Sequence, residues 1–283
     1  MKKILVTGSL GQLGRCLQDK ANQHADFEFK FVDKDELDIC HAEQVARFFK
    51  EYKPDFCINT AAYTAVDKAE EDTQKAFDVN AKGPKNLAES CLEHNTVLIH
   101  ISTDFVFDGQ KATPYTETDH PNPISVYGDT KLKGEIEIQK TLKKYFIIRT
   151  SWLYSEHGYN FMKTMLRLAK ERDEISVVDD QIGTPTYAGD LAGVILEIIA
   201  FDKDNYGIYH YSNEGTVSWF DFAKAIFEVS KLSTKVLPIK TKSYPTPAKR
   251  PKYSALDKTK IKDFLKKDIV FWRDSLNKVL TKI

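Results

Sequence analysis

The sequence predicts an α/β fold with a doubly wound parallel sheet, followed by a smaller C-terminal α/β lobe. In residues 1–150, short apolar runs alternate with segments of helical apolar spacing, which is the pattern of βαβ units. A glycine-rich turn follows the first apolar run, and the alternation becomes less regular after about residue 150. We therefore expect a core over residues 1–150 and a lobe formed mainly by residues 151–283, the two interleaving around a cleft.

The first half contains five predicted strands, and a predicted helix follows each of the first four. The strands are expected at 4–7, 27–33, 56–60, 97–102 and 145–150. The helices are expected at 11–23, 43–52, within 72–94, and at 125–142. Strands and helices in this order build a parallel sheet with helices on both faces.

The second half mixes the two patterns less regularly. Helices are predicted at 161–171, 187–200 and 218–229, and strands at 174–178, 208–211 and 236–239. The proline-rich stretch 244–251 (YPTPAKRP) predicts an extended loop, and a lysine-rich helical tail follows it.

Composition excludes several classes of protein. The 283 residues are 42% hydrophobic and carry 41 basic and 41 acidic side chains, so a general nucleic-acid partner is not expected. No apolar run approaches the ~20 residues of a membrane span, and the chain enters a strand at Ile4, so neither a membrane partner nor a signal peptide is expected. The four cysteines show no C-x-x-C spacing, which favours reduced thiols and a cytoplasmic location.

The turn after the first strand has the spacing G-x-x-G-x-x-G, at Gly8, Gly11 and Gly14. Such glycines allow a tight turn and close approach of a pyrophosphate to a helix N-terminus, so the turn predicts a dinucleotide site in a Rossmann-like fold. The alternative is an ordinary strand–helix turn. Asp33, about 20 positions after Gly14, suits a ribose hydroxyl, or else it serves only the turn. The neighbouring Lys34 suits a 2′-phosphate instead, which leaves NADH and NADPH both open.

Tyr127 and Lys131 form the sharpest chemical signal. Positions i and i+4 share one helix face, and an ammonium beside a phenol lowers the phenol pKa. A predicted strand ending in Ser102-Thr103-Asp104 supplies a hydroxyl near the carboxyl end of the sheet, where ligands of such folds bind. The alternative is a chance pair on a solvated helix.

These motifs resemble the extended short-chain dehydrogenase/reductase family. The markers are TGSLGQLG, Asn80 in VNAKG, the STD strand end and YGDTK. The resemblance is closest to reductases of nucleotide-linked deoxysugars, through NTAAYTAVDKAE, STDFVFDG, IRTSWLY, NFMKTMLRLAKER, DQIGTPT and YPTPAKRP. It implies hydride transfer from NADPH or NADH to the C4 ketone of a nucleotide sugar used for cell-surface polysaccharide.

The resemblance also implies the site residues. Tyr127 would donate the proton, Lys131 would hold the nicotinamide ribose, and Thr103 would orient the reacting oxygen. The implied cofactor-binding residues are Gly8, Gly11, Gln12, Leu13, Gly14, Asp33, Asp38, Ile39, Ala61, Ala62, Tyr63, Asn80, Tyr127 and Lys131. The implied substrate-binding residues are Thr103, Asp104, Trp152 and Arg250, with Asp67 and Lys68 as weaker candidates.

Three of the substrate residues have simpler alternatives. Asp104 can cap a turn, Trp152 can be a core aromatic, and Arg250 can be a solvated loop cation that pairs with no diphosphate.

A metal is not expected. Some members of the family carry a glutamate just after the last glycine, in a metal site that joins a dimer. Arg15 and Cys16 occupy those positions here, and neither supplies the carboxylate that Mg²⁺ prefers. The seven histidines are scattered along the chain. We therefore doubt a Mg²⁺ site and expect a monomer or a weak homodimer.

Two other functions remain open. A nucleotide-sugar epimerase or 4,6-dehydratase shares the superfamily, although a dehydratase needs carboxylates after the strand-end threonine and here Asp104 is followed by Phe105. A non-catalytic regulatory subunit also keeps this fold, but such proteins often lose the tyrosine or the lysine.

Overall fold

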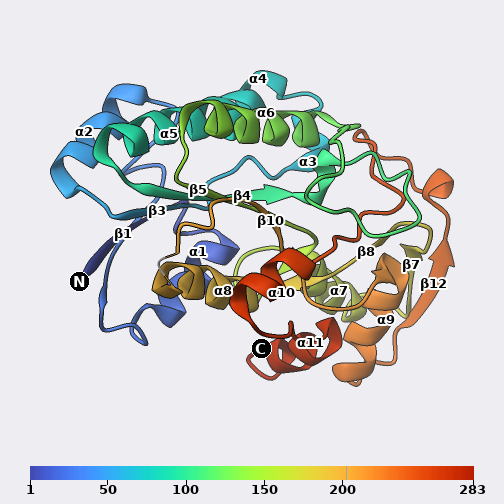
Figure 1. Ribbon diagram of the computed structural model, residues 1–283. Helices are drawn as coiled ribbons and strands as arrows, with labels where there is room; N and C mark the ends of the chain where they lie inside the picture. The colour runs from blue at the N-terminus through green and yellow to red at the C-terminus, as the bar shows by residue number, and fades with distance from the viewer. Residues whose placement is uncertain (202) are drawn as a thin grey trace.

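A six-stranded parallel sheet forms the centre of the computed structural model, which describes residues 1–201 and 203–283 (Figure 1). The strand order is β10-β5-β4-β3-β1-β2. The strands are β1 (Lys2–Thr7), β2 (Phe27–Val32), β3 (Phe56–Asn59), β4 (Val97–Thr103), β5 (Tyr145–Thr150) and β10 (Gly207–His210). The order reverses between β1 and β3, and the carboxyl ends of strands at such a switch point form a ligand crevice.

Helices cover both faces of this sheet (Figure 1). One face carries α1 (Gln12–Ala21) and α8 (Ala188–Phe201). The other carries α2 (Ala42–Tyr52), α5 (Gly83–His94) and α6 (Val126–Thr141).

Alternation along β1 divides its side chains between the two cores. Ile4 and Val6 pack in the core under α1 and α8, whereas Leu5 packs in the core on the other face. Every one of these side chains is 0% exposed, so the strand is buried on both sides, as parallel sheets require.

Short helical segments approach α6 from the carboxyl end of the sheet. They are α3 (Val66–Ala69), α4 (Thr73–Phe77), a π-helical turn (Asp78–Lys82) that runs into α5, and a 3-10 turn directly after β4 (Asp104–Val106). The expected helix within 72–94 is therefore three consecutive pieces, and π-helical turns often mark functional sites.

The second lobe has its own apolar core. Two-stranded sheets pair β7 with β12, β6 with β9, and β8 with β11. The lobe elements are β6 (Leu153–Tyr154), α7 (Phe161–Ala169), β7 (Glu174–Val178), β8 (Ile182–Gly183), β9 (Thr186–Tyr187), β11 (Val217–Ser218), α9 (Trp219–Val229), β12 (Lys235–Ile239), a 3-10 turn (Thr241–Ser243) and α11 (Trp272–Leu280).

The two halves of the chain interleave. Although α8, β10 and α10 (Thr259–Leu265) follow residue 150, β10 pairs with β5 in the central sheet, and α8 and α10 pack into the core beside α1. Among the described residues, none of the helices has the length and apolarity needed to cross a membrane.

The predicted α/β class with a parallel central sheet is confirmed. The sequence did not show β6, β8, β9 and β11, because two-residue strands are too short to display a period. The helix expected at 161–171 ends at Ala169.

Candidate active site

The glycine turn connects β1 to α1 at the switch point of the central sheet. Gly8 has φ +66°, and a Cβ there would lie 2.6 Å from the backbone of Ala61. A Cβ on Gly14 would lie 2.6 Å from Ser9. Both positions therefore need glycine, and α1 begins within this turn, so its N-terminus favours an anion there.

Asp33 braces this turn. Its Oδ2 accepts a hydrogen bond from the Leu10 N–H at 2.9 Å, and its Oδ1 accepts one from the Lys34 N–H at 2.7 Å. The Lys34 side chain is largely exposed, with its Nζ 3.7 Å from Asp38 Oδ2. The Asp33 carboxylate thus holds the turn in place. The sequence predicts that the same carboxylate binds an adenosine ribose.

Asn80 ties the segment after β3 to α6. It is 0% exposed, its Oδ1 accepts from the Tyr63 N–H at 2.8 Å, and its Nδ2 donates to Thr130 Oγ1 at 3.2 Å. Ala61, Ala62 and Tyr63 are held partly exposed beside the glycine turn. On the far side, Ile39 is buried against Gly83. The structure therefore brings the glycine turn, Asp33 and residues 61–63 together around the carboxyl ends of β1 and β3, while Ile39 packs at the start of α5.

Tyr127 and Lys131 lie in the first two turns of α6. Ser125 caps this helix by accepting the Gly128 N–H at 3.2 Å, and Gly128 itself is required because a Cβ would lie 2.2 Å from the Phe105 carbonyl. The Tyr127 phenol lies beside Thr103 at the end of β4, and the Thr103 side chain acts to lower the phenol pKa. The structure thus brings the three residues predicted as catalytic, Thr103, Tyr127 and Lys131, to one edge of the sheet.

Burial controls the acidity of these groups. It raises the pKa of Tyr127 to about 12, although the Thr103 side chain acts in the opposite direction. It lowers the pKa of Lys131 to about 8, against the attraction of Glu135. The phenol therefore carries its proton at neutral pH, while the lysine loses its proton easily.

Asp104 is more than a turn cap. The cap of the 3-10 turn is Thr103, whose Oγ1 accepts the Phe105 N–H at 3.2 Å. Asp104 is 2% exposed, and burial raises its pKa to about 6. Its Oδ1 accepts a hydrogen bond from Thr103 Oγ1 at 3.0 Å, and its Oδ2 has no hydrogen-bond partner among the described residues.

Trp152 has an unusual conformation. Its φ of +46° is in the left-handed region, where a bulky residue is strained. Its ring stacks on Trp219 with centroids 3.5 Å apart, and Gly183 leaves space for the indole. Trp219, which sequence reasoning missed, opens α9 and lines a cavity of about 640 Å³.

Arg250 closes one side of the same cavity. Its guanidinium donates to both carboxylate oxygens of Asp67, at 2.9 and 2.7 Å, and so joins the proline-rich loop to α3. This bond is the chief reason that the pKa of Asp67 lies below its usual value. Arg250 is therefore a fixed side chain at the cavity and not a freely solvated cation.

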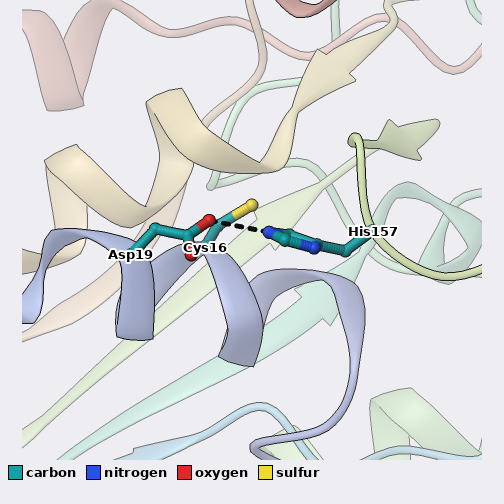
Figure 2. A group of neighbouring side chains, drawn as sticks. All are labelled: Cys16, Asp19 and His157. Carbon is teal, nitrogen blue, oxygen red and sulfur yellow. Dashed lines mark hydrogen bonds and ion pairs between the residues drawn. The ribbon is translucent and has the colours of Figure 1, made fainter. Parts of the chain in front are cut away.

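Cys16, Asp19 and His157 meet at the face of α1 (Figure 2). Their ligand atoms lie within 4.8 Å of one another, and His157 Nε2 is 2.7 Å from Asp19 Oδ2. A cluster with one carboxylate, one thiol and one imidazole does not fit Mg²⁺, which takes oxygen ligands. Burial raises the pKa of the Cys16 thiol to about 12. The cluster could not be predicted from spacing along the sequence, because His157 comes from the loop before α7, far from Cys16 and Asp19.

The fold and the Thr103–Tyr127–Lys131 arrangement define a Rossmann-like protein of the short-chain dehydrogenase/reductase type. The chain belongs to the RmlD substrate binding domain family, whose pattern it matches over residues 1–283.

Relatives agree in sequence and in structure. The dTDP-4-dehydrorhamnose reductase of Aggregatibacter actinomycetemcomitans is 46% identical over an alignment of 272 residues, and the match covers 92% of each chain. The crystal structure of a dTDP-4-dehydrorhamnose reductase from Clostridium acetobutylicum is also 46% identical, covers 99% of both chains and superposes with a TM-score of 0.94. A dTDP-4-dehydrorhamnose reductase from Bacillus anthracis, solved in complex with NADP, is 41% identical over 100% of both chains with a TM-score of 0.96.

Proposed function

We propose that this chain is an NADPH-dependent dTDP-4-dehydrorhamnose reductase. The reaction takes place in the cytoplasm and transfers a hydride to the C4 ketone of dTDP-4-dehydro-L-rhamnose. It gives dTDP-L-rhamnose, which is used for cell-surface polysaccharide. The observation that carries the proposal is the convergence of Thr103, Tyr127 and Lys131 on the crevice beside the glycine turn, in a chain whose relatives bear this name.

The cofactor is assigned to the crevice between the glycine turn and α6. The turn from Gly8 to Gly14 takes the pyrophosphate, Asp33, Asp38 and Ile39 surround the adenosine, and the segment 61–63 lies beneath the rings. NADPH is preferred to NADH because Lys34 is exposed beside Asp33, in reach of a 2′-phosphate, and because the Bacillus anthracis relative was solved with NADP. We propose no Mg²⁺ site at the cluster around Cys16, since Asp19 is its one carboxylate and Mg²⁺ takes several oxygen ligands.

Tyr127 is the proton donor. The bound cofactor supplies the hydride, and the ketone oxygen gains negative charge as the hydride arrives. The raised pKa keeps the phenol protonated until that moment, when the developing alkoxide is the stronger base. The Thr103 hydroxyl donates to Asp104 Oδ1 in this structure, and it would turn its single hydrogen to the ketone oxygen when the sugar binds. Lys131 would hold the nicotinamide ribose.

The substrate extends from this centre into the second lobe. Asp104 lies beside Thr103 with one free carboxyl oxygen for a sugar hydroxyl. The stacked Trp152 and Trp219 form an aromatic wall, and Arg250 is positioned at the cavity for the diphosphate. We propose that residues 1–150, with β10 and α8, serve mainly the cofactor and that the rest serves the substrate in a monomer or weak homodimer.

The deciding experiment follows the absorbance of the reduced nicotinamide with dTDP-4-dehydro-L-rhamnose as substrate. We expect stoichiometric consumption of NADPH, slower consumption of NADH, and no effect of a metal chelator. Because epimerases and dehydratases regenerate their cofactor, turnover of the sugar with no net NADPH loss would contradict the proposal. Absence of any turnover would favour a nucleotide-binding regulatory subunit.

Replacing Arg250 by Leu should raise KM for the nucleotide sugar roughly tenfold to a hundredfold, the range of a lost charged hydrogen bond. The loss also leaves the Asp67 carboxylate unpaired, so it repels the diphosphate. Steady-state kinetics at saturating NADPH measure the effect, and kcat should change less than KM. The matched control is Arg273→Leu, which removes an exposed arginine bound to Glu228. Equal KM values in both variants would contradict the assignment of Arg250 to the substrate site.

A further inference from the structure

A buried row of polar side chains runs from Lys131 across three strands of the sheet. Lys131 Nζ lies 3.4 Å from His100 Nε2, His100 Nδ1 lies 3.0 Å from Asn59 Nδ2, and Asn59 Oδ1 accepts from Thr7 Oγ1 at 2.8 Å. The row joins α6 to β4, β3 and β1, and each of the four residues is at most 1% exposed. Only Lys131 has a part in the proposed reaction.

The direction of these hydrogen bonds follows from one backbone group. The Ala61 N–H can only donate, and it points at the side-chain atom of Asn59 that also receives the Thr7 hydroxyl, at 3.2 Å. That atom is therefore the amide oxygen, and the amide nitrogen is the one that faces His100. Because this nitrogen donates, His100 Nδ1 presents a lone pair to it.

The proton of His100 must then sit on Nε2. The ring is neutral, since burial, together with the charge of Lys131, holds the pKa of His100 well below its ordinary value. A neutral imidazole has a single N–H, and here it points at Lys131. An N–H cannot accept a hydrogen bond from an ammonium group, but it can donate to the lone pair of a neutral amine.

Other groups around Lys131 have defined positions. On α6, Glu135 attracts the ammonium, but its carboxylate is already bound by Arg149 of β5 and by Ser102 of β4. On β4, the Ile101 carbonyl accepts from Lys131 Nζ at 2.6 Å.

Tyr127 and Asp104 are ionisable too, and both adjoin Thr103 at the end of β4. His100 contacts the amine of Lys131, and it is thus the neighbour that opposes a positive charge on that amine.

We propose that His100 is a positioning residue that disfavours the protonated form of Lys131. Asn59 contributes by fixing the imidazole tautomer in which the Nε2–H of His100 faces the lysine. The proposal rests on the proposed function, which places Lys131 on the nicotinamide ribose. Burial lowers the pKa of Lys131 to about 8, and the Nε2–H of His100 acts in the same direction. The lysine is charged below that pH and neutral above it, so cofactor binding and turnover should decline as the pH rises through about 8.

The sharpest test is Asn59→Asp, which keeps the shape and reverses the bond. A carboxylate accepts from Nδ1–H, so His100 takes the other tautomer and offers the Nε2 lone pair to the ammonium. The added carboxylate charge favours the ammonium as well, so the alkaline decline of kcat/KM should move to higher pH by about one unit, equivalent to a tenfold change in the acidity of Lys131. The uncharged variant His100→Leu isolates the part that is due to the imidazole N–H. His100→Leu removes the opposing N–H and should shift the decline in the same direction by less.

Asn86→Asp is the matched control. Asn86 is also buried, but its amide donates to the Ile39 carbonyl at 2.8 Å and it touches neither His100 nor Lys131. This variant should keep the wild-type position of the decline even where its stability falls. A decline that stays in place in both Asn59→Asp and His100→Leu, or that moves to lower pH, would overturn the proposal.

Two readouts work without the sugar substrate. The pH dependence of NADPH binding, followed by nicotinamide fluorescence, should show the same shifts, so it tests His100 even where the wild-type protein reduces no sugar. Nitrogen NMR of histidine-labelled wild-type protein gives the tautomer directly. The His100 signal, identified by its loss in His100→Leu, should show a protonated Nε2, and a protonated Nδ1 would contradict the proposal even where Asn59→Asp does not fold.

Discussion

Tyr127→Phe is expected to lower kcat by about 10²–10⁴, the contribution of a well-placed general acid. The change removes only the phenol oxygen, so the edge-on contact with the Phe105 ring, with centroids 5.5 Å apart, is kept. Tyr127 is the residue to which we assign the proton transfer. The loss should therefore appear in turnover and not in stability or NADPH binding.

Steady-state turnover, NADPH fluorescence titration and a thermal melt measure these three quantities separately. The control is Tyr52→Phe, which removes a hydroxyl that donates to the Glu28 carbonyl at 3.1 Å, far from the crevice. Turnover of Tyr127→Phe within a few fold of the wild type would exclude the phenol as the acid.

Arg149→Met is expected to destabilise the protein by about 3–5 kcal/mol, because it strands a buried carboxylate. The Arg149 and Glu135 side chains are 2% and 0% exposed, and Arg149 Nη2 donates to Glu135 Oε2 at 2.7 Å. The pair bridges β5 and α6, so it also anchors the helix that carries the catalytic side chains. Unfolding in denaturant, followed by circular dichroism, measures the change in free energy.

The double variant Arg149→Met with Glu135→Leu should recover part of that loss, since a buried pair replaced by apolar residues costs less than a single unpaired charge. Arg167→Met is the control, because its ion pair with Glu171 is exposed on α7 and is worth under about 1 kcal/mol. A loss in Arg149→Met no larger than in Arg167→Met would contradict the assigned cost of the buried charge.

Local patterns carried most of what the sequence could predict. The glycine turn and the Tyr127–Lys131 pair depend on spacings of a few residues, and the strands of the first half are long enough to show an apolar run. The central sheet and the convergence of these motifs at its carboxyl edge follow from the βαβ order, because parallel strands end at the same edge.

Contacts between distant segments were beyond the sequence. Arg250 meets Asp67 across the two lobes, and Trp219 stacks on Trp152 within the second lobe, although the two rings stand 67 positions apart in the sequence. The position of His100 in the row of polar side chains also had no signal, since a histidine inside an apolar strand reads only as a core residue. The structure was needed to show which of its two nitrogens faces Lys131.

The place of β10 in the central sheet has a consequence for folding during synthesis. Until residues 207–210 emerge from the ribosome, β5 presents an unpaired edge, and α1 lacks the cover that α8 provides. The nucleotide-binding half therefore cannot finish folding as an early unit during synthesis. A nascent chain that stops at residue 150 exposes both an open strand and an apolar helix face, which are the features that chaperones bind and that lead to aggregation.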